Sequence, residues 1–270
     1  MKKTGLILGL AAALPVVAAL PGFASKEKKA PFYGTNIAHR GLYTADQTIP
    51  ENSIAAFKAA VEEGYGIELD VQLTSDGYVV VFHDGDLKRM CGDSREVKDV
   101  TFDELQTMRL AGTDEKIPLF SEVLRVIGGK VPLVVELKVG NRPVELSKKT
   151  YAFLKDYVGD VCIESFNPFI VAWFRFNAPE LFRGLLAQRP EDYKENGVNA
   201  AGGFVLGNNL LNPICRPEFI AYKIGPQPWF VRLTQSLGAM KVGWTGKSEE
   251  CESGKDAIIF EHYRPKRKYK

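Results

Sequence analysis

Short apolar runs alternate along most of this chain with longer segments of helical pattern. The runs are "TNIA" (35–38), "IELDVQL" (67–73), "YVVVF" (78–82), "PLVVEL" (132–137), "VCIE" (161–164), "RGLLA" (183–187), "FIAYKI" (219–224), "KVGW" (241–244) and "AIIF" (257–260). Segments with apolar residues at three- and four-residue spacing separate several of them: 52–64, 101–110, 119–129 and 144–158. Such alternation is typical of a parallel sheet covered by helices.

The length of 270 residues suits one α/β domain of the TIM-type (β/α)8 barrel class. The nine apolar runs exceed the eight strands of such a barrel by one. Ser75-Asp76-Gly77 is a turn sequence between two β-rich runs, so residues 71–82 are predicted to form a hairpin in part. No repeat or low-complexity linker interrupts residues 31–270, which we therefore interpret as one domain.

The first 30 residues differ in kind from the rest. Lys2 and Lys3 precede 20 residues without a charge, Gly5 to Ala24, and polar sequence follows. Gly22-Phe23-Ala24 has the small-x-small form of a signal-peptide cleavage site, but the uncharged stretch is also long enough to span a bilayer. Residues 1–30 are thus predicted to be a signal peptide or an N-terminal membrane anchor. Either would make the protein extracytoplasmic (secreted) or membrane-anchored.

Charge and cysteine usage exclude two classes of site. The net charge of +2 is close to neutral, so no nucleic-acid partner is expected, and the basic tail "RPKRKYK" is interpreted as a solvated C-terminus. The four cysteines are widely separated and form no CxxC pair, which argues against zinc. Cys162, inside an apolar run, is expected to be a buried thiol.

Charged residues inside the apolar runs indicate a metal site. Side chains alternate faces along a strand, so Glu68 and Asp70 share one face, and Glu136 and Lys138 share another. Carboxylates grouped this way repel one another unless a cation lies between them. Glu68, Asp70 and Glu136 would bind one divalent cation, Mg²⁺ or Ca²⁺. The alternative, outward polar faces of surface strands, is disfavoured because barrel strands are covered on both sides.

Two of the three histidines follow apolar runs, His39 in "AHRG" and His83 in "VVVFHDGD". Chemistry in α/β barrels occurs at the C-terminal ends of the strands, where both histidines, Arg40 and Lys138 would converge with the carboxylates. His262 is not grouped with such charged residues in the sequence and is expected to be structural or exposed.

Several motifs occur in the order found in a known family. "AHRG", "PENS", "ELDVQLTSDGYVVVFHD", "LKRMCG", "IPLFSEVL", "VVELK", "CIESFNP" and "GWT" resemble the glycerophosphodiester phosphodiesterase family from about residue 33 to 263. The resemblance implies a TIM-type barrel that hydrolyses glycerophosphodiesters to glycerol 3-phosphate and an alcohol. It also implies functional residues at matching positions: metal ligands Glu68, Asp70 and Glu136, acid-base residues His39 and His83, and phosphate-binding residues Arg40 and Lys138.

Some assignments stay open at this point. Which histidine is the acid and which the base is undecided. Glu51 suits either the metal or a glycerol hydroxyl, but equally a helix N-terminus. Trp244 and Phe166 suit an aromatic wall of the site or core packing. Residues 190–240 and "GWTGKS" depart from the family pattern, which leaves the preferred alcohol undetermined.

Two other functions remain compatible with the sequence. One is a phospholipase D-like lipase on the same barrel. The other is a non-catalytic, membrane-tethered binding protein. The expected partner is a small-molecule glycerophosphodiester, with membrane association through the N-terminal segment.

Overall fold

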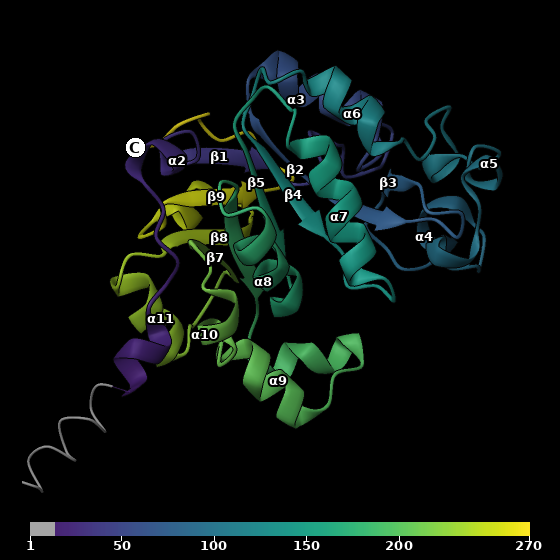
Figure 1. The fold of residues 1–270 in the computed structure, drawn as a ribbon. Helices are drawn as coiled ribbons and strands as arrows, with labels where there is room; N and C mark the ends of the chain where they lie inside the picture. Colours follow the sequence, from purple (N-terminus) through teal and green to yellow (C-terminus); the bar gives the residue numbers. More distant parts are fainter. Residues whose placement is uncertain (1–13) are drawn as a thin grey trace, which may run out of the picture.

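A nine-stranded sheet closes on itself in the computed structural model, which describes residues 14–270 (Figure 1). The strand order is β1-β9-β8-β7-β6-β5-β4-β2-β3, and β1 also pairs with β2. The strands are β1 Thr35–Ala38, β2 Gly66–Leu73, β3 Val79–Val81, β4 Leu133–Leu137, β5 Val161–Ser165, β6 Phe182–Ala187, β7 Phe219–Lys223, β8 Met240–Gly246 and β9 Ala257–Phe260. All but β3 form a closed parallel ring, which confirms the predicted TIM-type barrel.

The extra strand is the second arm of a hairpin. β3 pairs antiparallel with the end of β2, with Val71 opposite Val81. In the turn, the Thr74 amide donates to the Tyr78 carbonyl (3.0 Å), and Gly77 has φ 82°, a conformation that glycine adopts without strain. The hairpin predicted around Ser75-Asp76-Gly77 is confirmed, and β3 lies outside the ring.

Helices connect the strands and cover the outside of the barrel (Figure 1). They are α2 Lys26–Lys29, α3 Ile54–Glu63, α4 Lys88–Cys91, η1 Val97–Asp99, α5 Phe102–Leu105, η2 Leu110–Gly112, α6 Phe120–Ile127, α7 Pro143–Leu154, α8 Pro168–Asn177, η3 Pro190–Asn196, α9 Ala200–Gly207, α10 Asn212–Cys215, α11 Trp229–Ser236 and η4 Glu249–Glu252. The helical pattern at 101–110 predicted a longer helix than the structure has, because α5 makes only one turn. Leu105 and Leu110 instead pack into a small cluster beside β3.

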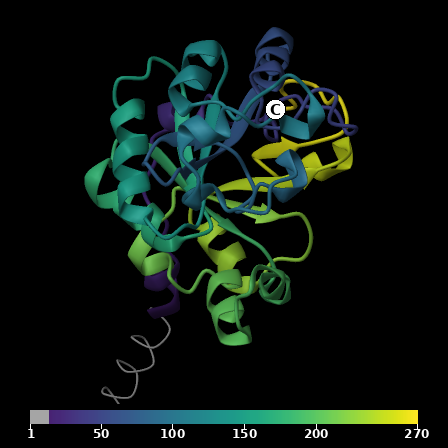
Figure 2. The same cartoon turned by 90° about the vertical axis from the view of Figure 1, so that its right-hand side faces the viewer.

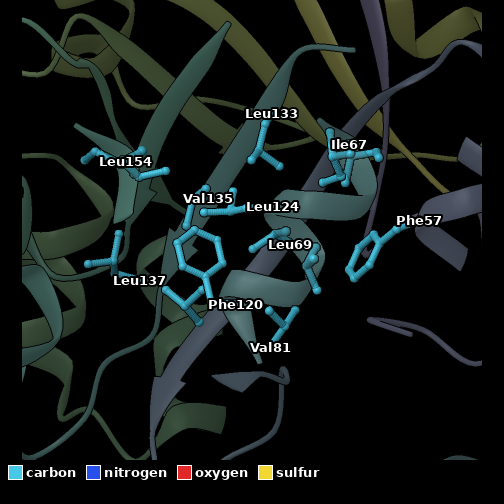
Figure 3. Packing of buried hydrophobic residues seen from close by; sticks show 14 of the residues in the cluster. Phe57, Ile67, Leu69, Val81, Phe120, Leu124, Leu133, Val135, Leu137 and Leu154 are labelled. Atoms are coloured by element: carbon cyan, nitrogen blue, oxygen red, sulfur yellow. The ribbon is translucent and has the colours of Figure 1, made fainter. Parts of the chain in front are cut away.

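Alternate strand side chains point outward to the helices. Figure 3 shows Leu69 of β2 and Val135 of β4 beside Phe57 of α3 and Phe120 of α6, and all four are fully buried. Burying each such side chain contributes roughly 1.5–3 kcal/mol. Because these positions face the helices, the residues between them face the inside of the barrel.

The N-terminal end of the barrel is closed by aromatic side chains. Phe32 packs on Phe182, with ring centroids 5.6 Å apart, and Phe182 packs on Phe219 at 4.9 Å. Gly184 leaves room for Phe219, since a Cβ there would lie 2.0 Å from the Phe219 ring. The barrel is thereby filled below its opposite, C-terminal mouth.

The chain before β1 lies against the barrel as far as it is described. The Gly22 amide donates to the Pro217 carbonyl (3.0 Å), and Lys28 Nζ lies 3.9 Å from the buried Glu218 carboxylate. Residues 1–13, which include much of the predicted hydrophobic segment, lie outside the described residues. Within residues 14–270 no helix combines the length and hydropathy needed to cross a bilayer. The domain boundary predicted at residue 30 stays a prediction.

Candidate active site

Three carboxylates converge inside the C-terminal end of the barrel. Asp70 of β2 lies opposite Glu136 of β4 in the strand register, and Glu68 is one inward position earlier on β2. One oxygen of each of the three lies within 4.8 Å of the others, and each residue is at most 7% exposed. Among residues 14–270 this is the only such group of potential metal ligands.

Two cations border the carboxylates. Lys138 Nζ lies 2.9 Å from Glu136 Oε1 and 3.3 Å from Asp70 Oδ1. Arg40 has φ 55°, and this turn lets its backbone amide donate to Glu68 Oε2 (3.0 Å) while its Nε lies 3.7 Å from Asp70 Oδ2. Three carboxyl groups thus face two cationic side chains in a buried space.

The protonation equilibria reflect this imbalance. Burial, followed by the charges of Asp70 and Glu136, holds the pKa of Glu68 well above its usual range. Burial opposes the charge of Asp70 too, but Lys138 and other nearby cations lower the pKa of this carboxyl. The cluster therefore contains one firmly ionised carboxylate and neighbours that resist ionisation without a further cation.

The donor set fits a divalent cation. Asp70 Oδ1 and Glu136 Oε1 are buried and face the Lys138 ammonium, and each carboxylate oxygen keeps a second lone pair that a further cation can use. The ligand atoms are all carboxylate oxygens, which hard divalent ions prefer. This fit supports a divalent cation at Glu68, Asp70 and Glu136.

His39 follows β1 directly, and a carboxylate holds its ring. His39 Nδ1 lies 2.8 Å from Glu261 Oε2, and the Tyr43 hydroxyl donates to the same oxygen (3.0 Å). The hydrogen-bond pattern assigns the proton to Nδ1, so Nε2, which lies 4.0 Å from Glu68 Oε2, is the free nitrogen. Burial lowers the pKa of His39 despite the Glu261 contact.

His83 has a similar partner. It lies two residues beyond β3, and its Nδ1 is 2.8 Å from Asp84 Oδ1. Arg89 Nε donates to the other Asp84 oxygen (2.6 Å) and thereby fixes the carboxylate. Burial opposes the charge of Asp84, yet the hydrogen bonds from His83 and Arg89 lower its pKa. Each histidine therefore has a carboxylate on one nitrogen and a free second nitrogen.

Glu51 lies beside the carboxylate cluster and is absent from the group of potential ligands. Its carboxylate accepts hydrogen bonds from Arg40 Nη1 (2.7 Å) and Arg89 Nη2 (2.6 Å). The N-cap of α3 is Ser53 instead, whose hydroxyl accepts from the Ala56 amide. In this structure, then, Glu51 links the Arg40 and Arg89 guanidinium groups.

Two aromatic residues lie near the C-terminal ends of β8 and β5. Trp244, on β8, donates from Nε1 to the Ala221 carbonyl (3.0 Å) and meets Phe166 edge to face, with centroids 5.5 Å apart. Both rings are partly buried on the barrel interior. Core packing is therefore shown for both rings, and an aromatic wall of the site stays a prediction.

The motifs did not single out several residues beside the site. Glu261 directly follows the run "AIIF", and Asp84 directly follows His83, so strand-end position was a signal available for both. Glu164 of β5 pairs in register with Glu136, is fully buried, and has its pKa held well above the usual range by burial. His262 lies closer to the site than expected, with Nε2 3.9 Å from Glu261 Oε1.

Comparisons with known proteins agree with this geometry. Residues 39–262 match the model of the glycerophosphoryl diester phosphodiesterase family. A glycerophosphodiester phosphodiesterase of Caldanaerobacter subterraneus subsp. tengcongensis is 41% identical over 165 residues, covering 56% of this chain and 66% of the relative. The rat lysophospholipase D GDPD1 is 34% identical over 150 residues, covering 51% of this chain and 46% of the relative. The aligned segments thus span less than two thirds of these relatives.

A solved structure shares the fold. The phosphodiesterase of Oleispira antarctica, determined with the product sn-glycerol-3-phosphate, superposes with a TM-score of 0.68 at 23% identity, covering 86% of this chain and 94% of that one. At this identity the likeness supports the barrel. The family match covers most of the chain and includes both strand-end histidines and the three carboxylates. The chain therefore belongs to the glycerophosphoryl diester phosphodiesterase family.

Proposed function

We propose that this protein is a metal-dependent phosphodiesterase that hydrolyses glycerophosphodiesters to glycerol 3-phosphate and an alcohol. One observation carries the proposal. A buried, all-carboxylate cluster lies between two histidines that are each oriented by a second carboxylate. Family membership and the glycerol 3-phosphate complex of the Oleispira antarctica phosphodiesterase support the choice of substrate.

Glu68, Asp70 and Glu136 hold the divalent cation in this proposal, with Mg²⁺ or Ca²⁺ as the expected ion. Such an ion withdraws charge from phosphoryl oxygens and so stabilises the transition state of diester hydrolysis more than the ground state. The protein supplies the geometry of the three oxygens and excludes water from their far side. Trp244 and Phe166 form the wall on the opposite half of the mouth.

Arg40 and Lys138 bind the phosphate. Arg40 Nε is buried without a hydrogen-bond partner, so it keeps a donor for a phosphate oxygen. Lys138 carries an ammonium whose charge Glu136 and Asp70 stabilise, in spite of burial that disfavours it. A planar guanidinium and a point charge on one anion fix its orientation as well as its charge.

His39 and His83 move the protons. With Nδ1 held by a carboxylate, each ring presents Nε2 as its free nitrogen. One histidine accepts a proton from the attacking nucleophile, and the other donates one to the oxygen of the departing alcohol. Such steps contribute typically 10²–10⁴-fold each.

Release of glycerol 3-phosphate from glycerophosphocholine tests the proposal. We expect turnover by the full chain, loss with EDTA, and better recovery with Mg²⁺ or Ca²⁺ than with a softer ion. Glu68→Gln should abolish turnover and also the stabilisation by the metal alone, which adds about 2.7 kcal/mol to the free energy of unfolding at 100 times the Kd and raises the unfolding temperature. The exposed Glu145→Gln is the matched control. Substrate binding without turnover would instead support the non-catalytic alternative.

A phospholipase D-like activity is the second candidate. It is favoured by the similarity to the rat lysophospholipase D and by an uncharged stretch, residues 198–215, that follows β6. Release of choline from lysophosphatidylcholine and from glycerophosphocholine, compared as kcat/KM, separates the two candidates. A preference for the acylated substrate would favour the lipase.

We also propose membrane association through residues 5–24 and an extracytoplasmic or membrane-anchored location. The uncharged stretch after Lys2 and Lys3 supports this proposal. Cell fractionation combined with N-terminal sequencing of the recovered protein tests it. A protein found only in the cytosol with an intact N-terminus would contradict it.

A further inference from the structure

α9 has two unlike faces. On one face, Gly203 and Gly207 lie directly on Pro190 of η3, where added Cβ atoms would come within 2.6 Å of the Pro190 carbonyl oxygen and 2.7 Å of its nitrogen. On the other, Phe204 is 57% exposed. No charged residue occurs from Val198 to Cys215. A helix packed this closely on one side presents its other side to the surroundings without any charge to solvate it.

Further apolar side chains follow Phe204 along the chain. Leu210 and Ile214 are 40% and 41% exposed. We call Phe204 of α9, Leu210 of the turn that follows and Ile214 of α10 together the α9 face. Scattered exposed apolar residues are ordinary, but an uncharged segment with several of them marks a contact surface.

The N-terminal apolar segment is hydrogen-bonded to α10 and to the residue that follows it. Asn212, fully buried in α10, donates from Nδ2 to the carbonyls of Ala18 (2.7 Å) and Leu20 (3.0 Å). Arg216 Nη1 donates to the carbonyls of Val17 (2.8 Å) and Leu20 (2.5 Å). Residues 17–20 of the uncharged stretch therefore lie beside α10, which begins five residues after α9 ends.

The two apolar features lie at one end of the molecule. Figures 1 and 2 both show α9 and the start of the described chain at the lower end. Arg175 borders this end of α10, where its Nη1 donates to the carbonyls of Pro213 (3.0 Å) and Ile214 (2.7 Å). Basic side chains at the edge of an apolar surface suit lipid phosphates.

We infer that the α9 face is a membrane-contact surface that inserts into the interfacial region of a phospholipid bilayer. The occupant is a bilayer because the N-terminal segment that is hydrogen-bonded to α10 at this end, residues 5–24, is itself apolar and uncharged. The inference deepens the membrane association proposed above and requires no catalytic activity.

The position of α9 gives this contact a consequence for substrate. α9 belongs to the connection that leaves the C-terminal end of β6, which is the end of the barrel at which the carboxylate cluster lies. A bilayer held at α9 would lie at the rim of the catalytic mouth. The class of substrate that this arrangement favours is a phosphodiester carried by a membrane lipid.

Quenching of tryptophan by brominated lipid tests the inference in the full chain. Phe204→Trp places the probe on the α9 face, and Leu210→Trp is a second probe. Val158→Trp is the matched control, because Val158 is 87% exposed and lies between α7 and β5, away from α9. With vesicles of phosphatidylcholine and phosphatidylglycerol, brominated acyl chains should quench both probes more than the three native tryptophans of the unmodified chain, and Val158→Trp should add no quenching.

The outcomes separate the two membrane proposals. Sedimentation of the full chain with vesicles, but equal quenching of Trp at 204, 210 and 158, would leave the N-terminal proposal intact and overturn this one. Failure to sediment would overturn both. Dimers in solution that Phe204→Ser abolishes would assign the face to a second copy and overturn the bilayer.

Discussion

At the scale of single residues, the contact between Glu261 and His39 can be tested by mutation. Its carboxylate lies 2.8 Å from Nδ1, and the hydrogen bond from His39 lowers the pKa of Glu261 against the effect of burial. Glu261→Gln keeps an acceptor but loses the charge that stabilises a protonated imidazole. We expect kcat on glycerophosphocholine to fall about 10–100-fold with little change in KM, measured by steady-state kinetics.

Lys247→Ala is the matched control for this prediction. Lys247 Nζ lies 3.2 Å from the other Glu261 oxygen, but its side chain is 69% exposed and does not touch His39. Its removal should change kcat far less. Equal losses in the two variants would show that charge near the mouth matters and that the His39 contact does not.

The alanine variants of the two histidines should differ in how their activity depends on the leaving alcohol. Removing the general acid is costly for a poor leaving group, whereas a nitrophenolate departs without protonation. Of His39→Ala and His83→Ala, one should retain much more activity on a nitrophenyl phosphodiester than on glycerophosphocholine, and the other should lose both alike. Parallel losses in both variants would contradict the division of roles, and full activity in either would remove that histidine from the mechanism.

At the scale of one element, the stability of α9 should respond differently to alanine at Gly202 and at Gly203. Gly203→Ala brings a Cβ against the Pro190 carbonyl and should destabilise α9 by about 1–3 kcal/mol. Gly202→Ala brings a Cβ within 2.8 Å of the Val198 side chain and 3.4 Å of the Asn199 side chain, and because neither contact is with backbone it should cost less than Gly203→Ala. Hydrogen exchange of residues 198–210 measures both, and equal protection in the two variants would contradict the packing.

Elements with a strict period were predictable from the sequence, and others were not. The nine apolar runs each became a strand, and strand parity placed Glu68 and Asp70 on the inner face because the alternation is a property of the backbone. The segment 101–110 misled because its apolar spacing serves contacts with β3 instead of a longer helix. Glu261 was missed although it stands at a strand end, because its contact with His39 also requires β9 to lie beside β1, and the local sequence does not show that pairing.

At the scale of the whole molecule, the segment before β1 contributes to stability more than to catalysis. A chain starting at residue 31 loses the acceptors of the buried Asn212 amide and one of the cations beside Glu218, Lys28, and each contact is worth about 1–3 kcal/mol. We expect it to be soluble and active with a lower unfolding temperature. A chain starting at residue 17 retains these contacts and should match the full chain in thermal denaturation. Identical unfolding temperatures for the two truncations would contradict this.

The pairing of His39 with Glu261 joins the first and last strands of the ring, 222 residues apart in sequence. A nascent chain therefore has no oriented His39 until its ninth strand has been synthesised and has docked beside the first. Catalysis should consequently appear all at once at the end of maturation, without a partly active precursor. If the proposed export takes place before folding, the proposed activity would arise only after the chain has left the cell that makes it.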